Sequence, residues 1–188
     1  MARIFWVVCP QCTKKFYAAK DDFRNKERPL LCPFCGKRFI DITANAGKDL
    51  LVSEVSRGLS FGDVDNDGDT DLLIANNNGH VRLFENKVGQ QKKWLGLRLM
   101  DSEGKRDMIG ALAGLKRTGM PTLWRRVRTD ASYCSANDAR LLFGLGDSET
   151  VGSIEIHWPD GTKEIWENPV PMKYTTLSKG FAGKETRQ

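Results

Sequence analysis

The chain has 188 residues, 40% of them hydrophobic, and a formal net charge of +5. These values are typical of a globular protein with one ordinary domain or two small ones, and they exclude a disordered or membranous composition. The longest apolar run near the start, residues 4–8, is far shorter than the roughly 20 residues of a membrane helix or the roughly 7–15 residues of a signal-peptide core. We therefore expect a cytoplasmic protein with no membrane partner.

The excess of positive charge lies in the first quarter of the chain. Residues 1–50 contain ten Lys and Arg against five Asp and Glu, whereas residues 51–188 contain 19 of each. Because the first fifty residues are basic and the rest of the chain is neutral, nucleic acid is a possible partner of the first segment.

Four of the five cysteines fall in two Cys-Pro-x-Cys pairs. The pairs span residues 9–12 and 32–35, nineteen residues apart, while Cys134 stands alone. Four thiolates in two such pairs can hold one zinc ion tetrahedrally and leave no open position, which is typical of a structural site. The alternatives are two disulfides, which need an oxidising compartment, and a redox motif, which needs only one pair. We predict a structural zinc site formed by Cys9, Cys12, Cys32 and Cys35.

The residues around the two pairs fit a small metal-dependent module. Residues 4–8 and 15–17 are expected to form strands beside the first pair, and residues 29–31 and 37–42 beside the second. A segment of about 45 residues buries little apolar surface, so the metal should supply much of its folding free energy. Over residues 1–42 the chain resembles a zinc ribbon of the bacterial Cys-Pro-x-Cys type.

The remainder of the chain has the pattern of an all-β protein. Residues 43–48 are small or polar, as in a linker, which places a boundary near residue 45. From residue 59 onward, short β runs alternate with turn signals, and no stretch shows a long helical period. We predict an all-β fold with a β-sandwich or barrel-like domain. The expected strands are residues 71–75, 81–85, 94–100, 111–117, 122–128, 140–144, 153–158 and 163–167.

Residues 63–71 place five aspartates at alternate positions. Without a cation, so dense a row of negative charge would oppose folding. Calcium takes roughly six to eight oxygen ligands and fits an Asp-x-Asp-x-Asp-Gly loop. An EF-hand is excluded because its glutamate position would fall on Ile74, and a solvated acidic turn is the remaining alternative. We predict a calcium site formed by Asp63, Asp65, Asp67, Asp69 and Asp71.

Phe61-Gly62, the aspartate loop and the apolar run 72–75 together resemble an FG-GAP (VCBS-type) repeat, the blade unit of integrin-like β-propellers. By that resemblance Asp69 would contribute its backbone carbonyl and the other four aspartates their side chains. Later segments are similar to the ASPIC/UnbV domain, which commonly follows FG-GAP repeats in secreted or surface proteins. The segments that carry this resemblance are Asn86 and residues 94–99, 106–111, 143–146 and 154–161.

The resemblance covers residues 56–168 and sets the expected domain limits. These are a zinc ribbon at 1–45, an FG-GAP-like calcium-binding hairpin at 56–90, an ASPIC/UnbV-like β-domain at 91–175 and a flexible tail at 176–188. Family members usually carry several repeats and an export signal, so the resemblance implies an extracellular or surface location. This chain instead carries one repeat and a zinc ribbon. A single blade cannot close a propeller, so the repeat is expected to pack on the following β-domain or on another chain, or to be a truncated remnant.

No residue set in the sequence indicates catalysis. His80 and His157 are not tied by any motif to a nucleophile or an acid. Cys134 is expected to be a small buried or half-buried residue rather than a nucleophile. The tryptophans at strand positions are expected first in the core and second as a sugar-stacking platform. They are Trp94, Trp124, Trp158 and Trp166.

We therefore expect a non-catalytic protein that binds zinc and calcium and interacts with a protein or a glycan. One alternative is a nucleic-acid-associated ribbon protein, whose basic module would bind phosphates and stack bases on aromatic side chains. Those side chains would be Phe16, Tyr17, Phe34 and Phe39. A second alternative is an enzyme of unrecognised type.

Overall fold

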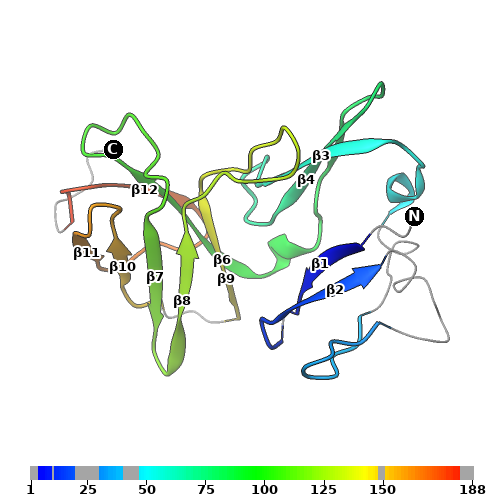
Figure 1. Ribbon diagram of the computed structural model, residues 1–188. Helices are drawn as coiled ribbons and strands as arrows, with labels where there is room; N and C mark the ends of the chain where they lie inside the picture. Colours follow the sequence, from blue (N-terminus) through cyan, green and yellow to red (C-terminus); the bar gives the residue numbers. More distant parts are fainter. Residues whose placement is uncertain (1–3, 10, 20–29, 40–46, 148–150, 183–188) are drawn as a thin grey trace. The chain divides into compact units, whose positions relative to one another are not determined.

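A computed structural model describes residues 4–9, 11–19, 30–39, 47–147 and 151–182 (Figure 1). Over these residues the protein consists of β-strands, loops and two short 3₁₀ helices, Lys48–Leu51 (η2) and Gly89–Gln91 (η3). No α-helix occurs in the described part of the chain, which confirms the predicted all-β fold class. Likewise, none of its helices is long and apolar enough to cross a membrane. The chain divides into two compact units, Met1–Ser53 and Glu54–Gln188.

The first unit is built on one β-hairpin. Strand β1 (Ile4–Val8) pairs antiparallel with β2 (Lys15–Ala19), and the turn between them carries the first cysteine pair. The second pair lies between Leu31 and Arg38, which form an isolated antiparallel bridge. Of the strands predicted beside the second pair, the described residues form this one bridge. Residues 29 and 40–42 of those predicted strands lie outside the described part.

The second unit begins with a three-stranded antiparallel sheet in the order β3-β4-β5. Its strands are β3 (Ser56–Gly62), β4 (Asp71–Asn76) and β5 (Arg82–Phe84). Gly62 pairs with Asp71, so the aspartate loop is the connection that closes the β3–β4 hairpin. Strand β3 was not among the expected strands, because its glycines and serines interrupt the apolar alternation of a strand.

Two further sheets follow in the same unit. In one, β6 (Lys93–Met100) lies between β9 (Leu141–Gly146), its antiparallel neighbour, and β12 (Tyr174–Ser178), its parallel neighbour. The other has the order β11-β10-β7-β8. Its strands are β7 (Leu112–Arg117), β8 (Met120–Arg126), β10 (Ile154–His157) and β11 (Lys163–Trp166).

Strand β12 corrects the expectation that a flexible tail begins at residue 176. Residues 176–178 belong to this strand, and Leu177 is buried against the core. The ordered sheet therefore extends past residue 175. The sequence did not predict this strand, because Tyr-Thr-Thr-Leu-Ser has a single aliphatic residue. Its pairing partner, β6, is also distant in the sequence.

The core of the second unit lies between the β6 and β7 sheets. Alternate residues of the strands point inward, as Ile154 and Ile156 do on β10, while Glu155 and His157 remain partly exposed. The two sheets form a sandwich and not a closed barrel (Figure 1). The buried cluster comprises Leu95, Leu97, Leu99, Ala111, Ala113, Leu115, Val127, Leu141, Phe143, Leu145, Ile154, Ile156, Trp158, Trp166 and Leu177.

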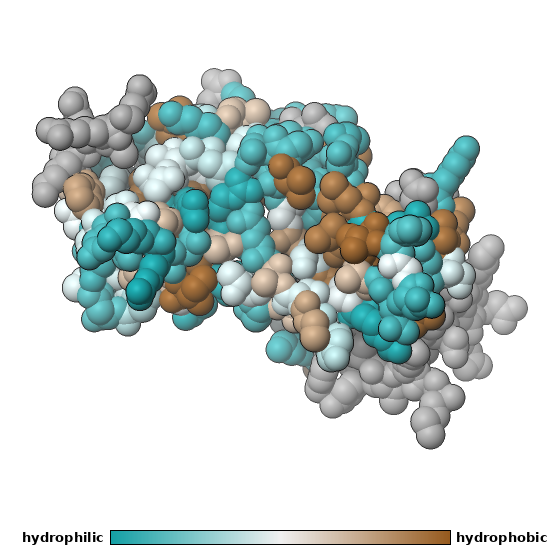
Figure 2. Space-filling view, turned by 90° about the horizontal axis from the view of Figure 1, so that it is seen from above, coloured by the Kyte–Doolittle hydropathy of each residue, from teal (hydrophilic) through white to brown (hydrophobic). Residues whose placement is uncertain are grey.

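On the face shown in Figure 2, hydrophilic side chains predominate and hydrophobic side chains gather in a few groups. One apolar pair lies on the small sheet, where Leu73 of β4 is directly opposite Leu83 of β5. These side chains are 43% and 47% exposed, respectively. This sheet therefore contributes little of its apolar surface to the core.

We expect Leu97→Ala to lower the free energy of unfolding of the second unit by about 2–5 kcal/mol, because the fully buried leucine would leave a cavity between the sheets. Leu83→Ala is the matched control, and its cost should stay below about 1 kcal/mol because that side chain is half exposed. Urea denaturation followed by tryptophan fluorescence measures both. Equal losses in the two variants would contradict the assigned core.

Candidate metal centres

The two cysteine pairs adopt the same backbone turn. At the first pair, the amide of Cys9 donates to the carbonyl of Lys14 (3.1 Å), and the amide of Thr13 donates to the carbonyl of Cys9 (2.8 Å). At the second pair, Cys32 bonds in the same way to Lys37 (2.8 Å) and Gly36 to Cys32 (2.9 Å). Both turns require a left-handed residue, which is Thr13 in one and Gly36 in the other. The repeated spacing in the sequence therefore produces two equivalent turns.

The four thiols converge on one point. The sulfur atoms of Cys9 and Cys35 are 3.6 Å apart, as are those of Cys12 and Cys32, and all four lie within 4.8 Å of one another. Four sulfurs at about 2.3 Å from a tetrahedral ion would be separated by about 3.8 Å, whereas a disulfide would bring two of them to about 2.0 Å. The cysteines are free thiols in this arrangement, and together they could hold a metal ion.

Electrostatics within the thiol cluster also favour a cation. Burial acts to raise the pKa of Cys9, but the backbone amides of Cys12 and Gln11 outweigh it and lower the pKa to about 6. For Cys35, the Lys37 amide acts to lower the pKa, but burial and the three neighbouring thiols raise it to about 12. One thiol of the group thus ionises readily and another keeps its proton. A full set of four thiolates requires a positive ion among them.

Among the side chains that the structure describes in the first unit, few apolar groups pack against this cluster. Cys9, Cys32 and Phe16 are its buried members, with Leu30 and Phe39 packed against them. The Phe16 and Phe39 rings contact each other at a centroid distance of 5.8 Å. Phe34 is 54% exposed, and the ammonium group of Lys14 lies 4.8 Å from its ring centroid. So small a core stabilises a fold only weakly without a further crosslink.

The aspartate loop folds around two buried carboxylates. The Asp63 carboxylate accepts hydrogen bonds from the amides of Asp67 (3.1 Å) and Gly68 (3.0 Å). The Asp71 carboxylate accepts from the amides of Val64 and Asn86, both at 2.8 Å. Asp63 and Asp71 are 4% and 1% exposed, so backbone amides hold two negative charges below the protein surface.

The structure brings three of the five predicted aspartates together. Carboxylate oxygens of Asp63, Asp65 and Asp71 lie within 4.8 Å of one another, and this group could hold a metal ion. Asp67 and Asp69 lie outside that group. The Asp67 carboxylate accepts a hydrogen bond from the amide of Asp69 (3.1 Å), and the Asp69 side chain is buried. The expected side-chain role of Asp67 is thus not seen in this group, whereas Asp69 was expected to contribute its backbone carbonyl and not its side chain.

Comparison with protein families assigns the parts of the second unit. Residues 57–91 match the FG-GAP repeat, and residues 101–184 match the family described as ASPIC and UnbV. Both matches fall within the second unit, and we call the matched segments the FG-GAP repeat and the ASPIC/UnbV domain. A search of curated proteins gave no match for the chain. The thiol cluster, at residues 9, 12, 32 and 35, resembles that of a zinc ribbon.

The aspartate loop of the FG-GAP repeat is packed on the ASPIC/UnbV domain. The Tyr174 hydroxyl donates to the Asp63 carboxylate at 2.9 Å, and the Arg140 guanidinium donates to the Asp63 backbone carbonyl at 2.6 Å. Arg140 also bonds the side chain of Asn66 and lies over the Tyr174 ring, 4.1 Å from its centroid. Burial, followed by the bond to Asp63, raises the pKa of Tyr174 well above its usual range. Tyr174 therefore remains a neutral donor to the loop.

Trp94 completes this contact. Gly68 has a φ of +91°, and a Cβ atom built there would lie 2.0 Å from the indole of Trp94. The bend of the aspartate loop thus rests directly on the indole face. Sequence reasoning identified Gly68 as a turn residue but missed Arg140 and Tyr174, because no local pattern connects them to the loop.

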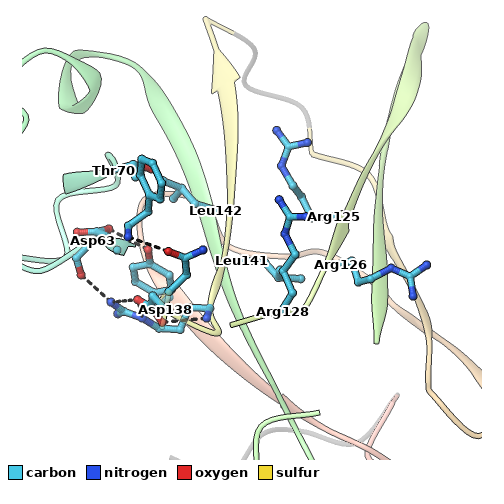
Figure 3. A pocket seen from close by; sticks show the side chains of 13 residues that line it. Asp63, Thr70, Arg125, Arg126, Arg128, Asp138, Leu141 and Leu142 are labelled. Carbon is cyan, nitrogen blue, oxygen red and sulfur yellow. Dashed lines mark hydrogen bonds and ion pairs between the residues drawn. The ribbon is translucent and has the colours of Figure 1, made fainter. Parts of the chain in front are cut away.

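A cavity of about 290 Å³ adjoins the loop on the side facing β8 and β9 (Figure 3). Its walls include Asp63 and Thr70 from the FG-GAP repeat together with residues of the ASPIC/UnbV domain. The latter are Arg125, Arg126, Arg128, Asn137, Asp138, Arg140, Leu141, Leu142 and Tyr174, and Phe61 and Gly62 of β3 complete the lining. We call it the β8 cavity.

The histidines and the fifth cysteine lie apart from both clusters. His157 on β10 contacts the Glu155 carboxylate at 2.6 Å and packs against Trp124 at 5.1 Å between ring centroids. The hydrogen bond from His157, and then that from Lys116, lower the pKa of Glu155 to about 2. Cys134 is exposed, which corrects the expectation of a buried or half-buried residue; it sits in a loop with a φ of 49°.

Three of the four tryptophans expected in the core are buried, namely Trp94, Trp158 and Trp166. Trp124 differs, because it is 39% exposed on the outer face of the β7 sheet. Its ring covers Gly114, where a Cβ atom would lie 2.6 Å from the indole. The glycine on β7 thus makes room for a tryptophan on the neighbouring strand.

We expect Gly68→Ala to lower the free energy of unfolding of the second unit by roughly 2–5 kcal/mol, because it combines a left-handed backbone with a clash against Trp94. Gly104→Ala is the control: its φ is +68°, but a Cβ atom there meets nothing within 4 Å. It should cost only the backbone strain, about 1–2 kcal/mol. Chemical denaturation measures both, and similar costs would mean that the contact of the loop with Trp94 is unimportant.

Proposed function

We propose that this protein is a non-catalytic binding protein with two metal ions, zinc in the cysteine module and calcium in the FG-GAP loop. Its β-domain would then bind a protein or a glycan. The observation that carries the proposal is the presence of two separate ligand clusters of opposite chemistry, four sulfurs in one and carboxylate oxygens in the other. Soft thiolates select zinc, whereas hard carboxylates suit calcium.

The choice of zinc is supported by the number and spacing of the sulfurs. Four thiols leave no position for water or substrate, so the ion would stabilise the module and not act on a substrate. The near-tetrahedral separations agree with that role. The repeated turns would hold the cysteines in place from both sides.

The choice of calcium is supported by loop charge and by the family assignment. Five aspartates lie between residues 63 and 71. The Lys87 ammonium is 3.5 Å from the exposed Asp65 carboxylate, and Arg140, which bonds the Asp63 backbone carbonyl, is itself paired with Asp138. One surface lysine offsets little of that charge. A divalent ion among the carboxylates would offset more of it, and the FG-GAP match covers the whole loop.

A second candidate function is nucleic-acid binding by the cysteine module. Lys14, Lys15, Lys37 and Arg38 are all exposed around the cysteine turns. Of the aromatic residues expected to stack bases, however, Phe16 is buried and Phe39 packs on it, which leaves Phe34 exposed, while the Tyr17 side chain lies outside the described part. A salt-dependent shift with single-stranded nucleic acid would favour this candidate. A calcium-dependent hit on a glycan or protein array would favour the first.

Purified protein prepared under reducing conditions is expected to contain about one zinc ion per chain. A strong chelator should unfold residues 1–42 and leave the second unit folded, because only the small module depends on the metal for its core. Atomic emission spectrometry and amide-exchange NMR measure these two effects. Cys32→Ser should reproduce the local unfolding, whereas Cys134→Ser should leave zinc content unchanged. Absence of zinc would refute this part of the proposal.

Calcium is expected to raise the melting temperature of the second unit, because it binds the folded loop by mass action. Asp65→Asn removes one carboxylate of the triad at an exposed position, so it should weaken the calcium effect while raising the melting temperature without metal. Differential scanning calorimetry with calcium and with a chelator measures the sign of each change.

The control for that measurement is Asp147→Asn, which removes an exposed carboxylate outside the loop. Its calcium response should match that of the wild-type protein. If wild type and Asp65→Asn melt alike at every calcium concentration, the loop is a solvated acidic turn and its metal site is disproved.

A further inference from the structure

The β8 cavity has walls of opposite character. On one side lie Asp63 and Asp138, and on the other lie the arginines of β8 and of the residues that follow it. In Figure 3 the Arg125 and Arg128 side chains run in the same direction, whereas Arg126 extends away from the Asp63 side. The lining contains four arginines and two aspartates, so it has an excess of positive charge.

The acidic wall is already engaged in hydrogen bonds and an ion pair within the protein. The Arg140 guanidinium contacts the Asp138 carboxylate at 2.6 Å, and the amide of Arg140 donates to the same carboxylate at 2.9 Å. Asp63 accepts from Tyr174 and from two loop amides. The Asn137 side chain is also engaged: its oxygen accepts from the backbone amide of Phe61, and its nitrogen donates to the backbone carbonyl of Asp130. Asp138 and Asn137 therefore have little capacity left for a ligand in the cavity.

The arginine wall is not neutralised. Among the described residues, Arg125 makes one hydrogen bond, to the backbone carbonyl of Trp124 at 3.3 Å, and no carboxylate pairs with its charge. Arg128 reaches Asp130 only at 3.9 Å, and both side chains are about 70% exposed. Strand β8 lies at the end of its sheet, so no further strand of the described sheet places an acid beside these arginines. Two guanidinium groups therefore border one cavity without a strong counter-charge.

We propose that the β8 cavity binds the carboxylate of a small organic acid through Arg125 and Arg128. A guanidinium group presents parallel N–H donors that match the two oxygens of a carboxylate. The volume suits a ligand of about one sugar ring or one amino acid. Leu141, Leu142 and the partly exposed Phe61 supply apolar contacts for its uncharged part. Acidic sugars and acidic amino acids share this chemistry. Arg125 and Arg128 belong to neither of the two metal-ligand clusters.

The test uses the full-length protein and three probes: glucuronate, N-acetylglutamate and neutral glucose. Titration followed by ¹H–¹⁵N NMR is expected to shift the amides of residues 125–128 with either or both acids and not with glucose. The acid that binds more tightly identifies the source of the carboxylate. Arg125→Gln/Arg128→Gln should weaken binding by about tenfold or more, because both charged donors are lost.

Arg106→Gln provides the matched control, since it makes the same charge change at an exposed residue outside the cavity lining. Its affinity should equal that of the wild type. Each single variant, Arg125→Gln and Arg128→Gln, is measured as well, so that a folding defect in the double variant cannot hide the result. Equal affinity in the wild type and the arginine variants would overturn the proposal, as would equal shifts with glucose and glucuronate or no binding of either acid.

Discussion

The position of the Asp63 carboxylate constrains most of the second unit. A negative charge at 4% exposure needs donors on every side, and they come from two domains: loop amides of the FG-GAP repeat and the hydroxyl of Tyr174 in the ASPIC/UnbV domain. The same residue belongs to the aspartate triad and borders the β8 cavity. Loop, domain contact and cavity are therefore parts of one polar network. A change at any of them alters the hydrogen bonds available to the others.

The cores of the two units differ in size and in composition. The second unit packs two sheets around a cluster of aliphatic and aromatic side chains. Where the first unit is described, its buried groups are few, and two of them are thiols. A small chain segment loses conformational entropy on folding that so few apolar contacts cannot offset, so a metal ion held by the four thiols, as proposed above, would be the main source of its stability. This difference explains why cysteines cluster in one unit and aliphatic strands in the other.

Local patterns predicted local features well. The Cys-Pro-x-Cys spacing identified four thiols that do converge, and the aspartate alternation identified the loop that closes the β3–β4 hairpin. The sequence did not reveal contacts made across long separations. Arg140 and Tyr174 reach Asp63 from 77 and 111 residues away, and no periodicity encodes such contacts. Strands β3 and β12 were missed for a related reason: their residues have weak strand patterns, and pairing with stronger neighbours defines them.

The order of strands around β6 has a consequence for biosynthesis. Strand β6 is hydrogen-bonded on one side to β9 and on the other to β12, whose residues begin 41 and 74 positions after the end of β6. During translation its apolar residues emerge from the ribosome long before either neighbour exists. At roughly 5–20 residues per second, that interval lasts several seconds. A nascent chain with an uncovered central strand is a natural substrate for chaperones that bind extended apolar segments, and slow codons after β6 would lengthen its exposure.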